Sequence, residues 1–233
     1  TAVFNNKNAG TGKAVTINGY SLSGPDASNY TLNTSNVTGT ITPRALVVSG
    51  LVAQSKVYDG SDLAQIGGTA SFNALAGDTV TVSSTGVTGK FDSKNVGNGK
   101  TVTVTGLSLG GADAGNYTAQ FPGTLSASIS PKAVTVGGLT ASDRVYNGLT
   151  TVAVTGTPSA SGLIAGDTVT LGGTIVGNLA NPNVGTGKAV SLSGLSVGGA
   201  DAGNYSFSLP NNLSASITPA TLTYTATPVS STQ

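Results

Sequence analysis

The strongest constraint on the fold is an internal repeat with a period of about 88 residues. The dipeptide Asn-Tyr recurs at this interval, and so does a proline about a dozen residues later. The repeated residues are Tyr30, Tyr117 and Tyr205, followed by Pro43, Pro131 and Pro219. A solenoid coil has roughly 20–45 residues, so this period instead indicates a small domain repeated in tandem.

The repeat predicts the domain organisation. Residues 47–134 and 135–222 each make a complete domain, whereas residues 1–46 match only the C-terminal half of one. Half a domain cannot bury its core alone, so we expect 1–46 to be poorly packed, or the true domain phase to differ. Residues 223–233 start a different module. Each repeated proline ends the last strand and stiffens the joint, because proline fixes φ and cannot donate a ladder hydrogen bond.

The periodicity inside each repeat is that of β-strands. Apolar and hydroxyl residues alternate at 79–82, 100–105 and 126–129, and Gly-rich breaks separate such runs. No segment of helical length carries a 3.6-residue apolar pattern. We therefore predict an all-β chain of tandem immunoglobulin-like antiparallel β-sandwich domains, with about seven strands each, in an elongated rod. A β-grasp-like domain is the alternative.

Composition narrows the chemistry. The chain has no Cys, His, Trp or Met, and its nine acidic residues are all Asp. The usual ligand sets for zinc, haem and iron–sulfur clusters are therefore missing, and without His and Cys neither a Ser-His-Asp nor a Cys-His nucleophile can be built. A net charge of +1 gives no basic field for nucleic acid. No run approaches the roughly 20 apolar residues of a membrane span. We expect no enzyme activity and no cofactor.

A pentapeptide is the clearest motif. Asp113–Tyr117 and Asp201–Tyr205 are identical, and the first copy, Asp26–Tyr30, has Ser28 in place of glycine. We interpret it as a structural tyrosine corner, in which the hydroxyl bonds the backbone a few residues upstream. The serine indicates that positive φ is not needed there. A calcium site at Asp113 and Asp201 is a weaker alternative, because calcium prefers several carboxylates.

Two further motifs are interpreted as turns. Tyr58-Asp59-Gly60 recurs as Tyr146-Asn147-Gly148, and both Asp-Gly and Asn-Gly suit a type I′ turn. The exchange of Asp for Asn argues against a catalytic or metal-binding carboxylate. The sequence Ala-Gly-Asp-Thr-Val, at 76–80 and 165–169, is interpreted as a turn that enters a strand.

A lysine opens the alternating strand in each copy, at Lys13, Lys100 and Lys188. Charged side chains on strands commonly limit pairing at sheet edges, and this is the favoured interpretation. The alternative is an intramolecular isopeptide bond between Lys100 and Asn116, assisted by Asp113.

In fixed order, these motifs resemble the YDG repeats, and the related mostly-β glycine-rich (MBG) repeats, of filamentous haemagglutinin-like bacterial adhesins. The matching segments are 57–60, 76–80, 95–100, 111–117 and 129–131. The second repeat departs from the pattern by having Asn147 in the name-giving triplet. The tail around 224–228 looks like the opening of the glycine-rich module.

The resemblance implies a secreted protein on the surface of a Gram-negative bacterium. Its repeats would form a stalk that projects an adhesive region, with neighbouring repeats as partners and a role in cell adhesion or biofilm. No catalytic residues come with it. The alternative function is that the repeats themselves bind a glycan, a host protein or the biofilm matrix. Such sites expose aromatic side chains, which this chain has in small number.

Overall fold

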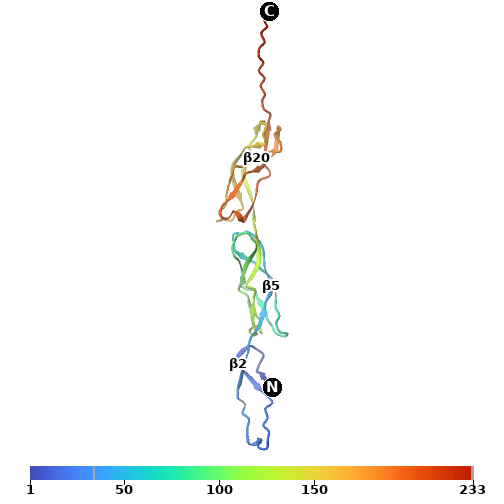
Figure 1. The fold of residues 1–233 in the computed structure, drawn as a ribbon, viewed down its shortest axis with the longest axis vertical. Coiled ribbons are helices and arrows are strands. Elements are labelled where there is room, and N and C mark those ends of the chain that lie inside the picture. The colour runs from blue at the N-terminus through green and yellow to red at the C-terminus, as the bar shows by residue number, and fades with distance from the viewer. Residues whose placement is uncertain (34, 232–233) are drawn as a thin grey trace. The chain divides into compact units, whose positions relative to one another are not determined.

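The predicted all-β class is confirmed. The computed structural model describes residues 1–33 and 35–231 (Figure 1). Its described residues form strands, loops and three single 3₁₀ turns, with no α-helix, so nothing corresponds to the helix of a β-grasp-like domain. The turns are η1 (Ala27–Asn29), η2 (Ala114–Asn116) and η3 (Ala202–Asn204). None of these is long and apolar enough to cross a membrane.

The chain divides into two compact units. The first contains 1–55, 62–93 and 98–128, and the second contains 56–61, 94–97 and 129–233. The loops 56–61 and 94–97 come from the repeat predicted at 47–134, yet they cluster with the residues that follow it. A compact unit and a sequence repeat therefore do not coincide. The domain boundaries predicted from the period stay a prediction.

The first unit begins with a small antiparallel sheet of order β1-β2-β3. Its strands are β1 (Ala2–Phe4), β2 (Gly10–Ile17) and β3 (Val37–Ile41). Val15 of β2 lies opposite Phe4 on one side and Val37 on the other. We refer to residues 1–41 as the half repeat.

The rest of the first unit is made of short strands. These are β4 (Arg44–Val47), β5 (Ser49–Ala53), β7 (Leu63–Ala64), β8 (Ile66–Ser71), β9 (Thr81–Ser83), β10 (Thr88–Phe91), β11 (Gly97–Thr105), β12 (Ser108–Gly110), β13 (Tyr117–Gln120) and β14 (Thr124–Ser130). Strands β14, β11, β10 and β7 are neighbours in one sheet, and β5–β8, β9–β12 and β4–β13 form separate pairs.

The second unit repeats this topology. Its strands are β6 (Lys56–Val57), β15 (Lys132–Ala141), β16 (Arg144–Val145), β17 (Thr151–Val152), β18 (Val154–Ser161), β19 (Thr170–Gly172), β20 (Val176–Asn178), β21 (Gly185–Ala189), β22 (Ser191–Ser193), β23 (Ser196–Gly198), β24 (Tyr205–Ser208) and β25 (Ser214–Thr218). The sheets have the orders β18-β15-β24, β16-β25-β21, β17-β20-β22 and β19-β23.

Two details of the strand prediction need correction. Residues 47–134 contain the segments β5 to β14, more than the seven expected. Glycines with positive φ, such as Gly86 between β9 and β10 and Gly106 between β11 and β12, lie at some of the breaks. The sheets are also not purely antiparallel. Strand β4 is parallel to β13, β15 to β24, β6 to β14 and β16 to β25.

Alternating side chains build the core, as predicted. In β11, Val102 and Val104 are buried, whereas the threonines between them are exposed. The core of the first unit also contains Leu46, Val48, Phe91, Tyr117 and Ala127. In the second unit, a cluster forms from Val152, Leu179, Val190, Ala215 and Ile217. This burial removes apolar surface from water and stabilises each unit.

Candidate functional site

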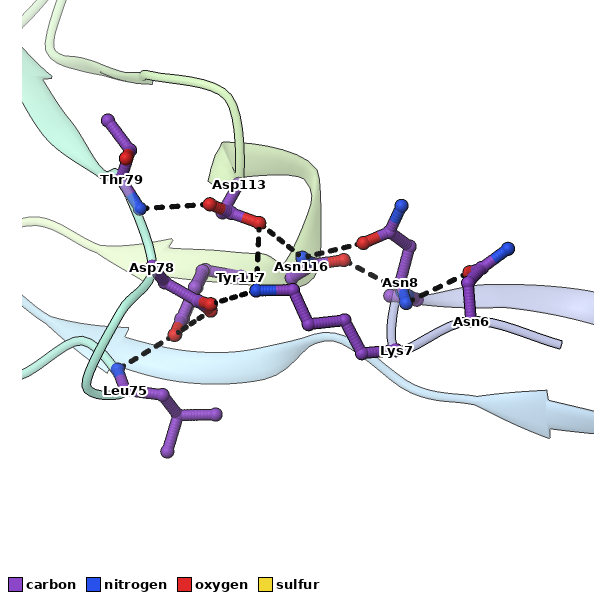
Figure 2. Close-up of polar contacts among 10 residues, drawn as sticks. Asn6, Lys7, Asn8, Leu75, Asp78, Thr79, Asp113, Asn116 and Tyr117 are labelled. Atoms are coloured by element: carbon purple, nitrogen blue, oxygen red, sulfur yellow. Dashed lines mark hydrogen bonds and ion pairs between the residues drawn. The ribbon is translucent and has the colours of Figure 1, made fainter. Parts of the chain in front are cut away.

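A lysine held between two aspartates is the main polar cluster of the first unit. The Lys7 ammonium lies 2.5 Å from Asp78 Oδ1 and 3.3 Å from Asp113 Oδ1. Figure 2 shows the lysine between these two carboxylates. Lys7 comes from the loop between β1 and β2, whereas Asp78 and Asp113 come from the following repeat. We call the cluster of Lys7, Asp78, Asp113, Asn116 and Tyr117 the Lys7 joint.

Hydrogen bonds from two loops fix the acidic side of this joint. The Tyr117 hydroxyl donates to Asp78 Oδ2 at 2.7 Å and accepts the backbone N–H of Leu75 at 2.8 Å. The Asp113 carboxylate accepts the N–H of Thr79 at 2.9 Å (Figure 2). These hydrogen bonds connect the loop 75–79 to the pentapeptide turn, and none of them involves Lys7.

The asparagine of the pentapeptide binds the lysine loop through its backbone. Asn116 Oδ1 accepts the N–H of Ala9 at 2.8 Å, and its amide nitrogen donates to Asn8 Oδ1 at 3.4 Å. The loop that presents Lys7 is therefore held at two more points beside the ion pair.

The second unit contains the same arrangement. The Lys94 ammonium lies 2.9 Å from Asp167 Oδ1 and 3.0 Å from Asp201 Oδ1. Asn204 accepts the N–H of Val96 at 2.9 Å. The Tyr205 hydroxyl donates to Asp167 and accepts the N–H of Ile164. We call Lys94, Asp167, Asp201, Asn204 and Tyr205 the Lys94 joint.

Tyr58 adds a contact to the Lys94 joint. Its side chain is 1% exposed, and its hydroxyl donates to Asp167 Oδ2 at 2.8 Å. Its ring packs edge-to-face against Tyr205, with 5.4 Å between centroids. Aromatic pairs in this geometry are favourable beyond their buried area. The repeated triplet at 58–60 thus presents a tyrosine to the next repeat of the chain.

Gly60 is required beside that tyrosine for steric reasons. It has φ +79°, and a Cβ atom there would lie 2.8 Å from the Cγ2 of Ile164. The equivalent Gly148 has φ +78°, with open space around it. Its neighbour Tyr146 is 43% exposed. The two triplets are alike in sequence but only the first is packed within a joint.

The electrostatics favour the charged forms of the ion pairs. Hydrogen bonds with Asp167 and Asp201 raise the pKa of Lys94 well above its ordinary value. Burial acts to raise the pKa of Asp167, but hydrogen bonds from Tyr205, Lys94 and Tyr58 outweigh it, so its pKa is lowered. The Thr168 N–H and then Lys94 lower the pKa of Asp201.

The Lys7 joint shows the same directions. The hydrogen bonds with Asp78 and Asp113 raise the pKa of Lys7. Contacts with Lys7 and then Tyr117 lower the pKa of Asp78. These directions favour the charged forms of Lys7 and Asp78, so the pair is held as an ion pair at neutral pH.

The local sequence determines the pentapeptide turn. Asp113 and Asp201 precede η2 and η3, and each directs its carboxylate to the facing loop instead of capping its own turn. Gly115 and Gly203 do not have positive φ, which confirms the inference from Ser28.

The hydroxyls of Tyr117 and Tyr205 do form hydrogen bonds with the backbone, as the tyrosine-corner interpretation predicts. Their partners, however, lie about 40 residues upstream in a facing loop, so the corner geometry was predicted incorrectly.

Among the described residues, no loop faces the first copy of the pentapeptide in this way. Tyr30 is 70% exposed, and its hydroxyl has no hydrogen-bond partner among residues 1–33 and 35–231. Asp26 precedes η1 in the same way as its counterparts. The structural role predicted for this copy therefore lacks its partner here.

The turn at Gly60 is not of type I′. That type needs positive φ at both central residues, and no residue other than glycine has positive φ in the described chain. Instead, Asp59 Oδ1 accepts the N–H of Ser61, and Asn147 Oδ1 accepts the N–H of Leu149. Asp and Asn share this acceptor oxygen, so the exchange keeps the turn.

The structure does not bring the three isopeptide candidates together. The Lys100 ammonium lies 2.6 Å from Asp92 Oδ1 and 2.8 Å from Ser93 Oγ. Asp113 and Asn116 instead belong to the Lys7 joint. Lys13 and Lys188 likewise bond asparagines seven residues upstream, at Asn6 and Asn181. This lysine therefore supports the loop that precedes its strand.

The calcium candidates Asp113 and Asp201 face ammonium groups. In each joint the lysine lies between two carboxylates, and a metal ion would have to displace it. Figure 2 shows this arrangement for Lys7. Over residues 1–33 and 35–231, no group of three or more metal-ligating side chains assembles. Calcium binding stays an untested prediction.

Sequence reasoning missed the two joint lysines and assigned Asp78 and Asp167 only to turns. A signal was present, because Lys7 and Lys94 occupy the same place in the repeat and Asp78 and Asp167 do too. The third copy has Pro182 at the lysine position. Distance in sequence hid the connection, since about 70 residues separate each lysine from its first aspartate.

The prolines lie where strands end. Pro43 separates β3 from β4, Pro131 separates β14 from β15, and Pro219 follows β25. These positions agree with the predicted strand ends. Beyond Pro219, the described tail is exposed and has no strand.

Comparison with known proteins gives a family. No curated protein matches the chain. The family model of the YDG domain matches residues 1–38, 42–125 and 130–215. Its three matches begin at the half repeat and next to Pro43 and Pro131, and together they cover most of the sequence. The chain therefore belongs to the YDG domain family.

Proposed function

We propose that these YDG repeats are structural spacers in the stalk of a secreted adhesin on the surface of a Gram-negative bacterium. The adhesive region would lie elsewhere in the protein. The observation that carries this proposal is the Lys94 joint. A loop from one repeat is held on the next by an ion pair to two aspartates, a buried tyrosine and a backbone hydrogen bond.

Such a joint resists bending better than a peptide linker does. A linker of a few residues around proline limits the distance between repeats but leaves rotations open. The joint adds contacts away from that linker, at Tyr58 and Lys94, so a rotation has to break hydrogen bonds that are partly shielded from water. A stalk needs this resistance in order to hold its tip away from the cell.

The remaining surface suits a spacer as well. Charged residues make up only 8% of the chain, and the exposed positions of strands such as β11 are mostly threonine. Isolated exposed apolar side chains are normal on soluble proteins. The catalytic residue types absent from the sequence are not needed for this role.

Small-angle X-ray scattering of the chain tests the spacer proposal. We expect a long, thin particle whose maximum dimension changes little between low and moderate salt. Replacing Lys94 with Met should broaden the distribution of shapes, because Asp167 and Asp201 lose their cation. Lys90→Met is the matched control, since Lys90 pairs with Asp62 outside either joint. A compact particle for the unaltered chain would contradict the proposal.

Ligand binding by the repeats is the alternative, and it stays a prediction. Of the two tyrosines beside the triplet turns, Tyr58 is buried and Tyr146 is half exposed, so they do not make a repeated aromatic surface. A glycan array probed with the whole chain separates the two functions. We expect no specific signal, and saturable binding that Tyr146→Ala abolishes would favour the alternative.

A further inference from the structure

The second triplet has an asparagine–glycine pair where the first has aspartate–glycine. Asn147 and Gly148 occupy the places of Asp59 and Gly60. The backbone nitrogen of a glycine can attack the side-chain carbonyl carbon of the asparagine before it, because the two groups are held together by the chain. Glycine has no Cβ atom to obstruct this approach. The pair is therefore a candidate for a reaction of the chain with itself.

Both residues of this pair are accessible. Asn147 is exposed, and a Cβ atom added to Gly148 would meet nothing within 4 Å. This accessibility does not depend on what packs against the triplet. The Asp59 side chain is 54% exposed, although the neighbouring Tyr58 is buried in the Lys94 joint. Water therefore reaches this place in the triplet of either repeat.

Two donors hold the side-chain oxygen of Asn147. The Arg144 guanidinium donates a hydrogen bond to Oδ1, and the Leu149 N–H donates to the same atom at 3.1 Å. Because both neighbours are donors, the oxygen of the amide faces them and its nitrogen does not. Donors at a carbonyl oxygen stabilise the negative charge that develops there when a nucleophile attacks the carbon. A cationic donor such as arginine is the stronger kind.

The first triplet shows that this place in the repeat stabilises a carboxylate. Asp59 Oδ1 accepts hydrogen bonds from the Lys56 ammonium at 2.7 Å and from the Ser61 N–H at 2.9 Å. Burial acts to raise the pKa of Asp59, but hydrogen bonds from Lys56 and Ser61 outweigh it, so its pKa is lowered. Arg144 and Leu149 are the counterparts of these two donors. An acid in the second triplet would meet the same stabilisation.

The other two asparagine–glycine pairs of the chain differ in this respect. In strand β11 the Gly99 N–H donates to Ser128 Oγ at 3.1 Å, so the nitrogen that would attack Asn98 is engaged. Asn18 lies in an exposed loop after β2, and among residues 1–33 and 35–231 its side-chain oxygen accepts no hydrogen bond. Only the pair in the second triplet joins an accessible glycine to an amide oxygen held by two donors.

We propose that Asn147 is a site of self-catalysed deamidation whose product is aspartate, so that the second triplet becomes Tyr-Asp-Gly like the first. A bond forms between the Gly148 nitrogen and Asn147 Cγ, and the bond between Cγ and Nδ2 breaks. The Gly148 amide proton passes to solvent, and the leaving nitrogen takes up a proton and departs as ammonia. Arg144 and the Leu149 N–H stabilise the oxyanion that forms on the way.

Water then opens the cyclic imide, and the same donors select the product. Attack of water at Cγ breaks the new bond to Gly148 and gives aspartate. Attack at the backbone carbonyl carbon of Asn147 gives isoaspartate instead. Arg144 and Leu149 polarise Cγ, so aspartate is favoured. The net reaction consumes one water and releases one ammonia, and it gives Arg144 an ion pair equivalent to that between Lys56 and Asp59.

Peptide mass spectrometry of the whole chain tests the proposal. The protein is incubated at neutral pH in water enriched in heavy oxygen, so that new carboxylates are labelled. We expect Asn147 to be converted faster than Asn18 and Asn98, with the label mainly in ordinary aspartate. Fragmentation by electron transfer distinguishes aspartate from isoaspartate. In denaturant, the preference for Asn147 and for aspartate should disappear, because the donors are no longer held at Oδ1.

Variants of Arg144 test its role. Arg144→Met should slow the conversion by about tenfold, the effect of losing one hydrogen bond to a charged group, and should raise the share of isoaspartate. Arg144→Lys should restore both rate and product, because Lys56 makes this contact in the first triplet. Arg44→Met is the matched control, since Arg44 is the other arginine of the chain and is exposed in β4. NMR signals of the buried Tyr205 ring check that each variant is folded.

Three outcomes overturn the proposal. One is that Asn147 of the folded chain stays intact while Asn18 is converted. Another is that isoaspartate is the main product at Asn147 in the folded chain. The third is that folded Arg144→Met is converted at the rate of the unaltered chain and with the same products, since the arginine would then have no part in the reaction.

Discussion

The half repeat and the complete repeats contain the pentapeptide with a single difference, Ser28 in place of glycine, but its tyrosine is buried only in the complete ones. Residues before the turn have φ and ψ of −100° and 8° at Asp26, −101° and 7° at Asp113, and −103° and 2° at Asp201. Tyr30 is nevertheless 70% exposed, whereas Tyr117 and Tyr205 are each 6% exposed. The turn is encoded locally, and the burial depends on a facing loop.

The comparison separates local sequence, which forms the turn, from contacts with distant segments, which bury the tyrosine. The 3₁₀ turn is closed by backbone hydrogen bonds within the pentapeptide, and it forms in all three copies. Burial of the tyrosine hydroxyl needs a donor and an acceptor from elsewhere, because an unpaired buried hydroxyl is costly. The loops that contain Leu75 and Ile164 provide them in the complete repeats.

The largest expected effect is the loss of the buried tyrosine. Tyr205→Ala should destabilise its repeat by about 3 kcal/mol, the range seen when a buried aromatic side chain is removed. Tyr30→Ala should change stability by less than about 0.5 kcal/mol, as for an exposed position. Denaturant unfolding of both variants measures the difference. Equal losses would show that the half repeat is packed in solution.

Removal of the pentapeptide aspartate should have a smaller effect in the same direction. Asp201→Ala deprives the Thr168 N–H of its acceptor and leaves Lys94 with one carboxylate. Asp26→Ala, its counterpart in the half repeat, should leave the thermal midpoint unchanged. The comparison fails if Asp26→Ala lowers the midpoint as much as Asp201→Ala does.

Acidification should weaken the joints. The lowered pKa values of Asp167 and Asp201 mean that their contribution is complete above about pH 4, the unfolded value for Asp. It is lost as the pH falls through the lowered folded pKa. The raised pKa of Lys94 has the opposite sign, so its contribution is complete below about pH 10.4 and is lost only as the pH rises through the raised value.

This pH dependence can be followed at single tyrosines. Between pH 5 and pH 2, roughly spanning the carboxyl titration, NMR signals of Tyr205 should move toward those of an exposed ring. The signals of Tyr30 should stay where they are, because that ring is exposed already. A shift of Tyr30 comparable with that of Tyr205 would contradict the assignment of the acid response to the joints.

The smallest effect is expected at the glycine of the pentapeptide. Gly203→Ser should be tolerated within about 0.5 kcal/mol, because Ser28 has this place in the half repeat and φ is not positive. Gly166→Ser is the matched control and should cost about 1 kcal/mol, since Gly166 has φ +91°. Thermal unfolding ranks the two variants, and a reversed order would contradict the local account of the turn.

Much of the fold could be predicted from residue patterns. The alternation at Thr101–Thr105 predicts a half-buried strand, and β11 is one, because a period of two places successive side chains on opposite faces. The number of strands and their parallel pairs could not be predicted in this way. Pairing between β4 and β13 joins residues about 70 apart, and no local pattern encodes such a contact.

The candidate site shows the same division. Asp113, Tyr117 and their repeats could be identified as structural residues because the motif recurs, and Lys100 could be identified as a lysine with a repeated place. The sequence did not indicate which aspartate each lysine contacts. Lys100 forms an ion pair with Asp92, which is near it in the sequence. Lys7, which belongs to none of the motifs identified in the sequence, forms ion pairs with the distant Asp78 and Asp113.

The repeat, the all-β class and the pentapeptide turn follow from the residue pattern, because each depends on spacing or on backbone preferences within a few residues. Long-range packing determines which copies of a motif are buried and which lysine contacts the aspartates. Those outcomes depend on segments that are distant in the chain, and Tyr30 and Tyr205 differ for this reason alone.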